Sequence, residues 1–555
     1  MSLTSSTQLE SPRWHVSGTV SVRGTAFHGA QALAGVDLAA RFRDVDSLDA
    51  LCAALSPLAG FYAVIVDADD ATYAAVDHAR SMPLAYTDDG RVGEPRALVG
   101  DVDPAAYDPR AADEMLTGGR VSGARTLVPG LRSLRAGEAV RVTGTDVDRR
   151  RYHRHVPRAE ESVDPALTAT LVDRLDAALS RAGERFVDFV DGRTVALSLS
   201  GGYDSRLIAL LLAEQRYEDV VAFAYGSRDD EDVRLSERVA DALGFRWEFV
   251  PYTEDRWRRW YESEGRRYYR EAFGYDAIVN DGIALAVRDL LSSGRVPSDA
   301  VFTAGQCVTS TAQQLSGDIW ATTEADGGIG LDLVGDPVEY PVGAFGLWRW
   351  DDVAFDSHLE ERFRDAAPDL PLDTFAGSLA AIESWKWEEI ETKYFVGDAR
   401  QYEFYDADWW FPLFDREVLD AWADLPAAER IDRRAYLRLV DERYRRQTGD
   451  RSPPSTASKE AVGFARIGKR VSESRVGAHL RGPFYRLYRH VADPDLPLGR
   501  GGIVPDEPLA RLYTGREKIQ AFQALAAAGR LSLDTGEVSD PPRAGAVSLA
   551  STPSP

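Results

Sequence analysis

Cysteine is nearly absent from this chain of 555 residues, which contains only Cys52 and Cys307. The two cysteines lie far apart and form no CxxC pair, so a disulfide scaffold and a cysteine zinc site are both excluded. The chain also lacks an apolar run of about 18 residues and a recognisable signal peptide. These absences predict a soluble, cytoplasmic protein that does not bind a membrane.

Lysine is also scarce. Of the 65 basic residues five are lysines, and the rest are arginines. The 89 acidic residues leave a formal net charge of -24, which repels the phosphates of nucleic acids and of anionic lipids. We therefore expect no nucleic-acid partner, and the composition is similar to that of proteins from salt-adapted, halophilic organisms. The lysines are Lys386, Lys393, Lys459, Lys469 and Lys518.

Apolar and aromatic residues, in contrast, are plentiful. Hydrophobic residues make up 44% of the chain, with 12 Trp, 22 Tyr and 21 Phe. This is enough apolar material to offset the entropy cost of ordering a globular chain. The length favours roughly two to four domains.

The first part of the chain has a β-rich pattern. Short apolar or alternating stretches, separated by Asp and Gly, predict successive strands up to about Tyr152. Residues 1 to about 13 are polar, and we expect them to be mobile ahead of the first strand. The expected strands are 16–22, 60–67, 72–76 and 83–87.

The second part alternates strands with helices. Apolar residues at helical spacing begin near Asp164 and mark a change to a helix-rich domain. The alternation predicts an α/β fold with a doubly wound parallel sheet and right-handed crossovers, followed by a mostly helical region after Asp351. The expected elements are helix 164–182, strand 194–199, helix 203–214, strand 220–225, helix 232–243, helix 278–291 and strand 300–304.

The most informative segment is residues 197–206, LSLSGGYDSR, between a buried strand and a helix. Its two glycines allow a sharp turn that presents backbone N–H groups, and the helix N-terminus adds positive potential, so the segment predicts an anion cradle. We expect Ser200 and Ser205 to donate hydroxyls to phosphates, whereas Asp204 requires a cation, which we assign to Mg²⁺. The alternative is a glycine turn whose Ser and Asp residues only cap the helix.

This loop resembles the pyrophosphatase loop of the asparagine synthetase and β-lactam synthetase family, which cleaves ATP between its α and β phosphates. Further segments resemble the same family in order: AYG at 224–226, VADALG at 239–244, FTAG at 302–305, ADWWFPLFD at 407–415 and SKE at 458–460. The resemblance implies a cleft that binds ATP and Mg²⁺. The cofactor-binding residues it implies are Ser198, Ser200, Gly201, Gly202, Tyr203, Asp204, Ser205, Tyr225, Gly226 and Gly305, with Asp204 as the metal ligand.

The β-rich region resembles, more loosely, the glutaminase domain that precedes the synthetase domain in this family. The similar segments are 58–64, 78–80, 83–86, 134–137 and 151–153. A working glutaminase of this type uses an N-terminal cysteine as nucleophile. No cysteine follows Met1, and Cys52 falls in a helical apolar pattern where packing is its expected role. The resemblance therefore implies a degenerate α+β sandwich of the N-terminal-nucleophile (Ntn) type, retained as a scaffold.

The synthetase part departs from the family after its third strand. The acidic turn GEGxD, which supports Mg²⁺ and pyrophosphate in the family, is replaced here by GQCVT at 305–309. Metal binding would then depend on Asp204, with Asp318 as a candidate replacement charge. We expect Cys307, within this turn, to be packed rather than reactive.

The resemblance implies two catalytic residues outside the loop. Asp408 stands where the family has glutamate, and its alternative role is that of a helix cap. In the β-lactam-forming relatives this carboxylate works with a tyrosine, for which Tyr405 and Tyr394 are the candidates. Lys459 matches the family's lysine-bearing loop, where its ammonium would neutralise charge on the adenylate and pyrophosphate. The alternative is a solvated surface lysine.

The implied function is an ATP-dependent, AMP- and pyrophosphate-forming amide ligase without its own glutaminase. It would activate a carboxylate, with aspartate as the first candidate, for attack by ammonia or an amine. A ligase acting on a sugar acid or secondary-metabolite carboxylate and a nucleotide-binding pseudoenzyme are the alternatives. Its partners would be small molecules, and a homodimer is left open. The expected domains are 14–155 (degenerate glutaminase-like), 164–475 (ATP-pyrophosphatase), 476–533 (helical C-terminal extension) and 534–555 (disordered tail).

Overall fold

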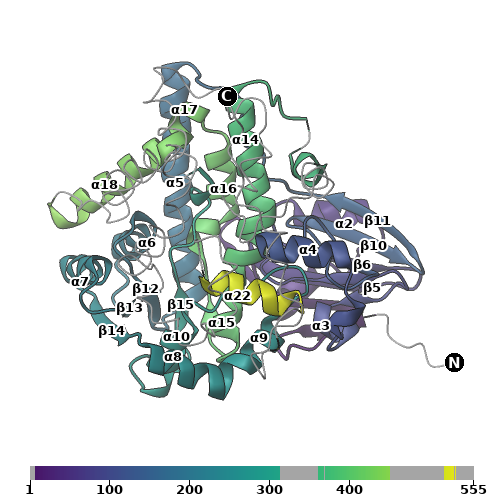
Figure 1. Ribbon diagram of the computed structural model, residues 1–555. Helices are drawn as coiled ribbons and strands as arrows, with labels where there is room; N and C mark the ends of the chain where they lie inside the picture. The colour runs from purple at the N-terminus through teal and green to yellow at the C-terminus, as the bar shows by residue number, and fades with distance from the viewer. Residues whose placement is uncertain (1–6, 313–360, 368, 451–517, 530–531, 533–555) are drawn as a thin grey trace, which may run out of the picture.

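The computed structural model describes residues 7–312, 361–367, 369–450, 518–529 and 532. Strands and helices are mixed, and the chain forms two regions on either side of the long helix α5 (Pro165–Val190) (Figure 1). The β-rich N-terminal region lies on one side, and a parallel sheet with its helices lies on the other. Helix α5 contacts both, through strand β4 (Gln31–Ala34) and helix α6 (Tyr203–Glu214).

The N-terminal region contains two sheets. The larger one is antiparallel, has the strand order β11-β10-β6-β5-β3-β2, and includes β4 paired with β3. Its central strand β5 is buried on both faces, which explains its continuous apolar sequence. The smaller sheet has the order β1-β8-β7-β9. The strands are β1 (Thr7–Gln8), β2 (His15–Ser17), β3 (Val20–His28), β5 (Leu58–Asp67), β6 (Thr72–Val76), β7 (Ala85–Thr87), β8 (Val92–Gly93), β9 (Leu131–Ser133), β10 (Glu138–Thr143) and β11 (Asp146–Arg151).

The start of the chain differs from the expectation. Residues 7–13 are not a mobile lead-in, because β1 pairs in parallel with β8. The backbone N–H groups of Glu10 and Ser11 donate to the Glu94 carboxylate at 2.6 and 2.8 Å. This polar segment pairs with residues about 85 positions further along the chain, and local composition does not predict such a long-range pairing.

The second region is built on a five-stranded sheet in which every pairing is parallel, as predicted. The strand order is β14-β13-β12-β15-β16. Strands β13 and β14 are added on one side of β12 and strands β15 and β16 on the other, so the strand order reverses at a topological switch point between β12 and β15. The sequence patterns missed β14, which is only partly buried, and β16, which has two residues. The strands are β12 (Val195–Ser198), β13 (Val220–Gly226), β14 (Arg246–Pro251), β15 (Val301–Thr303) and β16 (Asp408–Trp409).

Helices dominate the described residues after 361, which confirms the predicted fold class of an α/β core with a helical C-terminal region. Helix α14 (Phe375–Lys386) is buried along almost its whole length, and the π-helical segment η4 (Trp387–Phe395) continues it. Helix α16 (Arg416–Ala423) packs on α5, and α18 (Arg434–Thr448) packs on α6. Helix α22 (Lys518–Ala527), yellow in Figure 1, lies against α4 (Pro109–Gly118).

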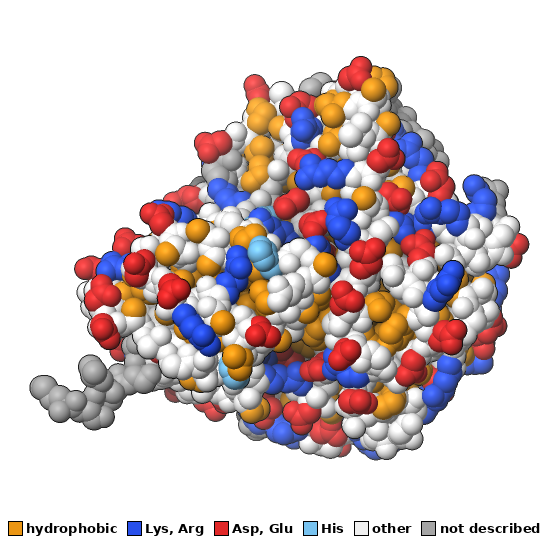
Figure 2. Space-filling model, turned by 180° about the vertical axis from the view of Figure 1, so that it is seen from behind, with side chains coloured by type: hydrophobic (Ala, Val, Ile, Leu, Met, Phe, Trp, Pro, Cys, Tyr) orange, Lys and Arg blue, Asp and Glu red, His pale blue; other side chains and the backbone are white. Residues whose placement is uncertain are grey.

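The acidic side chains are not gathered into one patch on the face drawn in Figure 2. On the face drawn in Figure 2, acidic and basic side chains are interspersed across the molecule. Within the described ranges no helix combines the length and the apolar character needed to cross a bilayer.

Candidate active site

The glycine loop lies at the switch point of the parallel sheet. It follows the carboxyl end of β12 and leads into α6, which begins at Tyr203 with Gly202 as its N-cap. Tyr225 and Gly226 end the neighbouring strand β13, and Gly305 follows β15 on the other side. Ligands of open α/β sheets bind beyond the carboxyl ends of the strands at such a point. The structure thus brings the predicted cofactor-binding residues to one edge of the sheet.

The loop is held in shape by its own hydroxyls. The Ser205 hydroxyl accepts a hydrogen bond from the Ser200 backbone N–H at 3.0 Å, and the two serine hydroxyls are 3.0 Å apart. The Gly202 N–H donates to the Ser200 hydroxyl at 3.2 Å. A Cβ atom at Gly305 would lie 2.7 Å from the backbone nitrogen of Ser205, so a side chain there would displace the loop. The cradle is therefore preformed, and it lies at the positive end of α6.

Asp204, in the first turn of α6, is already neutralised by the chain itself. One terminal nitrogen of Arg433 donates to both carboxylate oxygens, at 2.8 and 3.1 Å. The Tyr436 hydroxyl donates to one of those oxygens at 2.8 Å. The same Arg433 nitrogen lies 3.4 Å from the Thr309 hydroxyl oxygen, which accepts from it. Arg433 and Tyr436 come from the start of α18, more than two hundred residues after the loop.

This arrangement does not fit the predicted magnesium role of Asp204. A carboxylate that binds Mg²⁺ has to offer it a lone pair and negative charge, whereas a guanidinium engages both Asp204 oxygens. The described part of the chain also contains no group of three or more His, Cys, Asp and Glu side chains placed to hold a metal ion. Asp318, the other predicted source of charge, lies outside the described residues.

The Asp204 side chain is partly exposed, but the residues that contact its carboxylate are buried. Burial alone lowers the pKa of the Arg433 guanidinium, but the neighbouring Asp204 carboxylate opposes burial and the pKa is raised. Burial, reinforced by Asp204, raises the pKa of the Tyr436 hydroxyl well above its ordinary value. The same two causes raise the pKa of the Cys307 thiol to about 12, which fits a packed residue and not a nucleophile.

The turn after β15 gains a carboxylate from the helical region. The Ser310 hydroxyl donates to Glu391 at 2.6 Å, and the Lys386 ammonium donates to the Ser310 carbonyl at 2.9 Å. Lys386 and Glu391 are both buried, 1% and 2% exposed. Burial raises the pKa of Glu391 and lowers that of Lys386. Nothing in the local sequence indicated that either residue approaches the loop.

The raised pKa of Glu391 predicts a pH-dependent stability. A carboxyl whose pKa is higher in the folded state stabilises the fold at low pH, and this contribution is lost as the pH rises above the ordinary value of 4.5. We expect Glu391→Gln to flatten the fall in urea stability of the wild type between about pH 5 and pH 7.5. Glu442→Gln, at an exposed position of α18, is the matched control and should keep the wild-type slope. Parallel slopes in the wild type and Glu391→Gln would contradict the assignment.

Asp408 lies away from the loop. It is in register with Val301 and, through β15, with Val195, which puts it at the amino edge of the sheet. Along the strand direction, this level is three residues, or about 10 Å, from that of Ser198. Its oxygens are bound by Arg13 at 2.8 Å and Arg193 at 2.6 Å. The structure therefore does not bring Asp408 together with the predicted nucleotide-binding residues.

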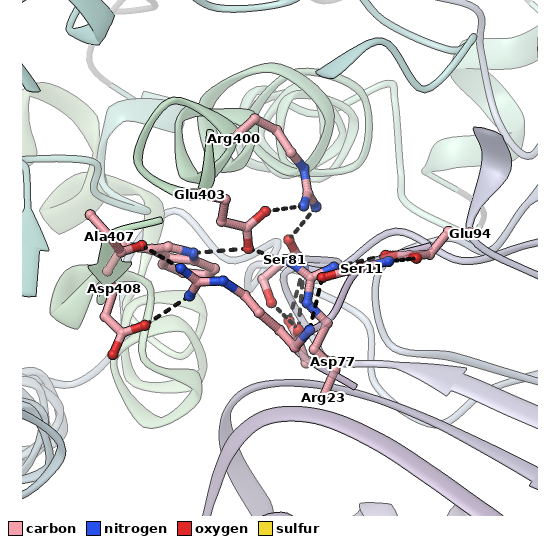
Figure 3. Close-up of polar contacts among 11 residues, drawn as sticks. Ser11, Arg23, Asp77, Ser81, Glu94, Arg400, Glu403, Ala407 and Asp408 are labelled. Atoms are coloured by element: carbon pink, nitrogen blue, oxygen red, sulfur yellow. Dashed lines mark hydrogen bonds and ion pairs between the residues drawn. The ribbon is translucent and has the colours of Figure 1, made fainter. Parts of the chain in front are cut away.

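Asp408 instead belongs to a polar contact between the two regions (Figure 3). Arg23 of β3 bridges Glu94 at 2.8 Å and Glu403 at 2.6 Å, and Arg400 donates to the Ser81 carbonyl at 3.0 Å. Burial alone raises the pKa of Glu403, but Arg400 and Arg23 outweigh it and lower the pKa to about 2. These buried charges fix the N-terminal region against the helices that follow β15.

The two tyrosine candidates make side-chain hydrogen bonds to residues other than Asp408. The Tyr405 hydroxyl donates to Glu264 at 2.8 Å, and the Tyr394 hydroxyl accepts from Gln520 at 3.2 Å. Lys459 lies outside the described residues, so its predicted role in the cleft stays a prediction.

The chain was compared with protein families, curated proteins and solved structures. A model of the family described as asparagine synthase matches residues 174–260. No curated protein matches the chain. Among solved structures, the chain is similar to the allosteric regulatory enzyme of purine biosynthesis, with 13% identity over 58% of this chain and 61% of that chain and a TM-score of 0.17.

A second solved structure is glutamine phosphoribosylpyrophosphate (PRPP) amidotransferase from B. subtilis complexed with ADP and GMP. It is 12% identical over 53% of this chain and 63% of that chain, with a TM-score of 0.16. Each match spans less than two thirds of the other chain. The segment that matches the family model, residues 174–260, contains the whole loop of residues 197–206 and the neighbouring strand β13. Residues 174–260 are thus similar to the asparagine synthase family.

Proposed function

We propose that the protein is an ATP-dependent amide ligase that forms AMP and pyrophosphate, and that aspartate is the first carboxylate to test. The observation that carries this proposal is the SGGYDS loop at the switch point of a parallel sheet, within the segment that matches the asparagine synthase family. The preformed turn and the N-terminus of α6 offer backbone N–H groups to phosphate oxygens.

The reaction proceeds in two steps. A carboxylate oxygen of the substrate attacks the α-phosphorus of ATP, the bond to the β-phosphate oxygen breaks, and pyrophosphate leaves with that electron pair. Ammonia or an amine then attacks the acyl carbon and expels AMP with loss of a proton. The loop contributes most to the first step, because charge develops on the leaving pyrophosphate where fixed donors can stabilise it.

Isotope exchange between labelled pyrophosphate and ATP tests the proposal. Exchange that depends on an added carboxylate reports adenylate formation independently of the amine. Aspartate, sugar acids and other small carboxylates are compared in parallel, so that the same assay identifies the acid. A nucleotide-binding pseudoenzyme would give no exchange with any acid, and that result would refute the ligase.

Glutamine is not expected to serve as the nitrogen donor. The sequence has no cysteine after Met1, and the nearest one, Cys52, is buried in α2 (Leu48–Leu55), where burial raises the pKa of its thiol. A thiol of that kind is a poor nucleophile. Steady release of glutamate from glutamine by the purified protein would disprove this prediction, and ammonium salts serve as the positive control for amide formation.

Lys459 is expected to support the first step. If its ammonium meets the polyphosphate mainly as charge builds on it, Lys459→Ala should lower kcat by about a hundredfold or more, with a smaller change in the KM for ATP. Lys459→Arg should restore only part of kcat, because a planar guanidinium replaces a compact ammonium poorly. Lys469→Ala is a control within the same stretch of sequence, and wild-type kinetics in Lys459→Ala would rule the role out.

A further inference from the structure

Two helix N-termini and one guanidinium meet at Asp204. Helix α6 begins one residue before Asp204, and α18 begins one residue after Arg433. Each N-terminus carries positive potential, and a cation at such an end is ordinarily disfavoured. Among the described residues, the carboxylate paired with Arg433 is that of Asp204, and the positive potential of both helix ends can attract an additional anion.

Arg433 is also held there in a costly backbone conformation. Its φ is 53°, in the left-handed region that residues other than glycine rarely adopt. The side chain is only 7% exposed. Within the described residues every hydrogen bond of this guanidinium runs through one terminal nitrogen, so Nε and the second terminal nitrogen are left to donate to a ligand.

We propose that Arg433 is the cation that binds the phosphates at the loop, and that Asp204 positions this arginine instead of a divalent metal ion. The inference rests on the proposed function, since it takes ATP as the ligand of the loop. A guanidinium fork matches two phosphate oxygens at once, and its orientation by Asp204 and Tyr436 leaves little freedom to lose on binding. As pyrophosphate leaves, the same group stabilises the negative charge that collects on it.

Metal dependence of ATP binding distinguishes this arrangement from a carboxylate-held metal. A site whose cation is part of the chain should bind ATP without Mg²⁺. We therefore expect calorimetric titration of the full chain with ATP to give Kd values within about threefold of each other in excess EDTA and in excess MgCl₂. This measurement needs no variant, so it does not depend on whether substitutions at buried positions fold.

The variants test whether Asp204 acts through Arg433. In EDTA, Arg433→Gln should weaken ATP binding by about tenfold or more, and Arg433→Lys should recover part of the loss. Asp204→Asn should weaken binding too, but adding it to Arg433→Gln should change Kd by less than about twofold, because a positioning residue has no effect once its partner is gone. Arg438→Gln is the matched control on α18, where Arg438 pairs with Glu429 at the surface.

Thermal melting of each variant is compared with that of Arg438→Gln to check that the variant folds. If Arg433→Gln does not fold, ATP binding is measured in Arg433→Lys instead. Binding that requires Mg²⁺ in the wild type, is lost in Asp204→Asn and is kept in the Arg433 variant would overturn the inference while leaving the proposed function intact. Absence of ATP binding under both conditions would overturn the proposed function and the inference with it.

Discussion

Replacing Asp204 by asparagine is expected to lower carboxylate-dependent pyrophosphate–ATP exchange by about a hundredfold or more. The substitution keeps the size of the side chain and removes its charge. Arg433, which is 6% exposed, would then be a buried cation without its counter-charge, and the Tyr436 hydroxyl would lose an ionised acceptor. Both groups would leave the positions from which they face the loop.

The fold should survive this change. Helix α6 is anchored by apolar side chains that the substitution does not touch, including Leu207, Ile208 and Leu211. Circular dichroism and the melting midpoint of Asp204→Asn are therefore measured beside the exchange rate. Asp241→Asn, at an exposed position of helix α7 (Glu231–Leu243), is the control and should exchange like the wild type. An unchanged exchange rate in Asp204→Asn would remove Asp204 from the site.

Glu383→Ala is expected to destabilise the fold by about 3–5 kcal/mol, the largest stability effect that the structure predicts. Glu383 and Arg430 are both 0% exposed, and their ion pair is 2.8 Å long. Burial raises the pKa of Glu383, while Arg430 opposes that shift. Removing the carboxylate leaves the guanidinium with backbone carbonyls as its acceptors, among them that of Arg158 at 2.9 Å. An uncompensated charge in such a place costs far more than the lost contact.

Urea unfolding of the full chain measures this effect, and two variants bracket it. Glu383→Gln keeps the volume and one hydrogen bond, so its loss should be smaller. Glu429→Ala removes the partner of Arg438, whose side chain is 58% exposed, and should cost less than about 1 kcal/mol. A loss below about 1 kcal/mol in Glu383→Ala would mean that Arg430 finds other counter-charges on relaxation.

Contiguous segments were predicted well. The buried strand, glycine turn and helix of the loop occupy neighbouring positions, so their apolar spacing and turn residues are readable without the rest of the chain. The structure places β12 at Val195–Ser198 and α6 at Tyr203–Glu214, close to the expected ranges. The parallel sheet followed from the same alternation of strands and helices, although the short β16 and the half-buried β14 gave too weak a pattern.

Residues that act across long sequence distances were not predictable in the same way. Arg433, Tyr436 and Glu391 reach the neighbourhood of the loop only because the helical region folds back onto it. In the sequence, nothing distinguishes these three residues from the many other arginines, tyrosines and glutamates of the chain. The segment 407–415 illustrates the converse, because its resemblance suggested a catalytic Asp408 that the register of β16 puts at the opposite edge of the sheet.

The sequence by itself determined the fold class and the position of the loop along the chain, since each depends on residue types and spacings within contiguous stretches. Only the tertiary structure decided what faces Asp204. The charge balance of a site is set by groups brought together from distant segments, and the pairing of Asp204 with Arg433 could not be predicted from the loop motif alone.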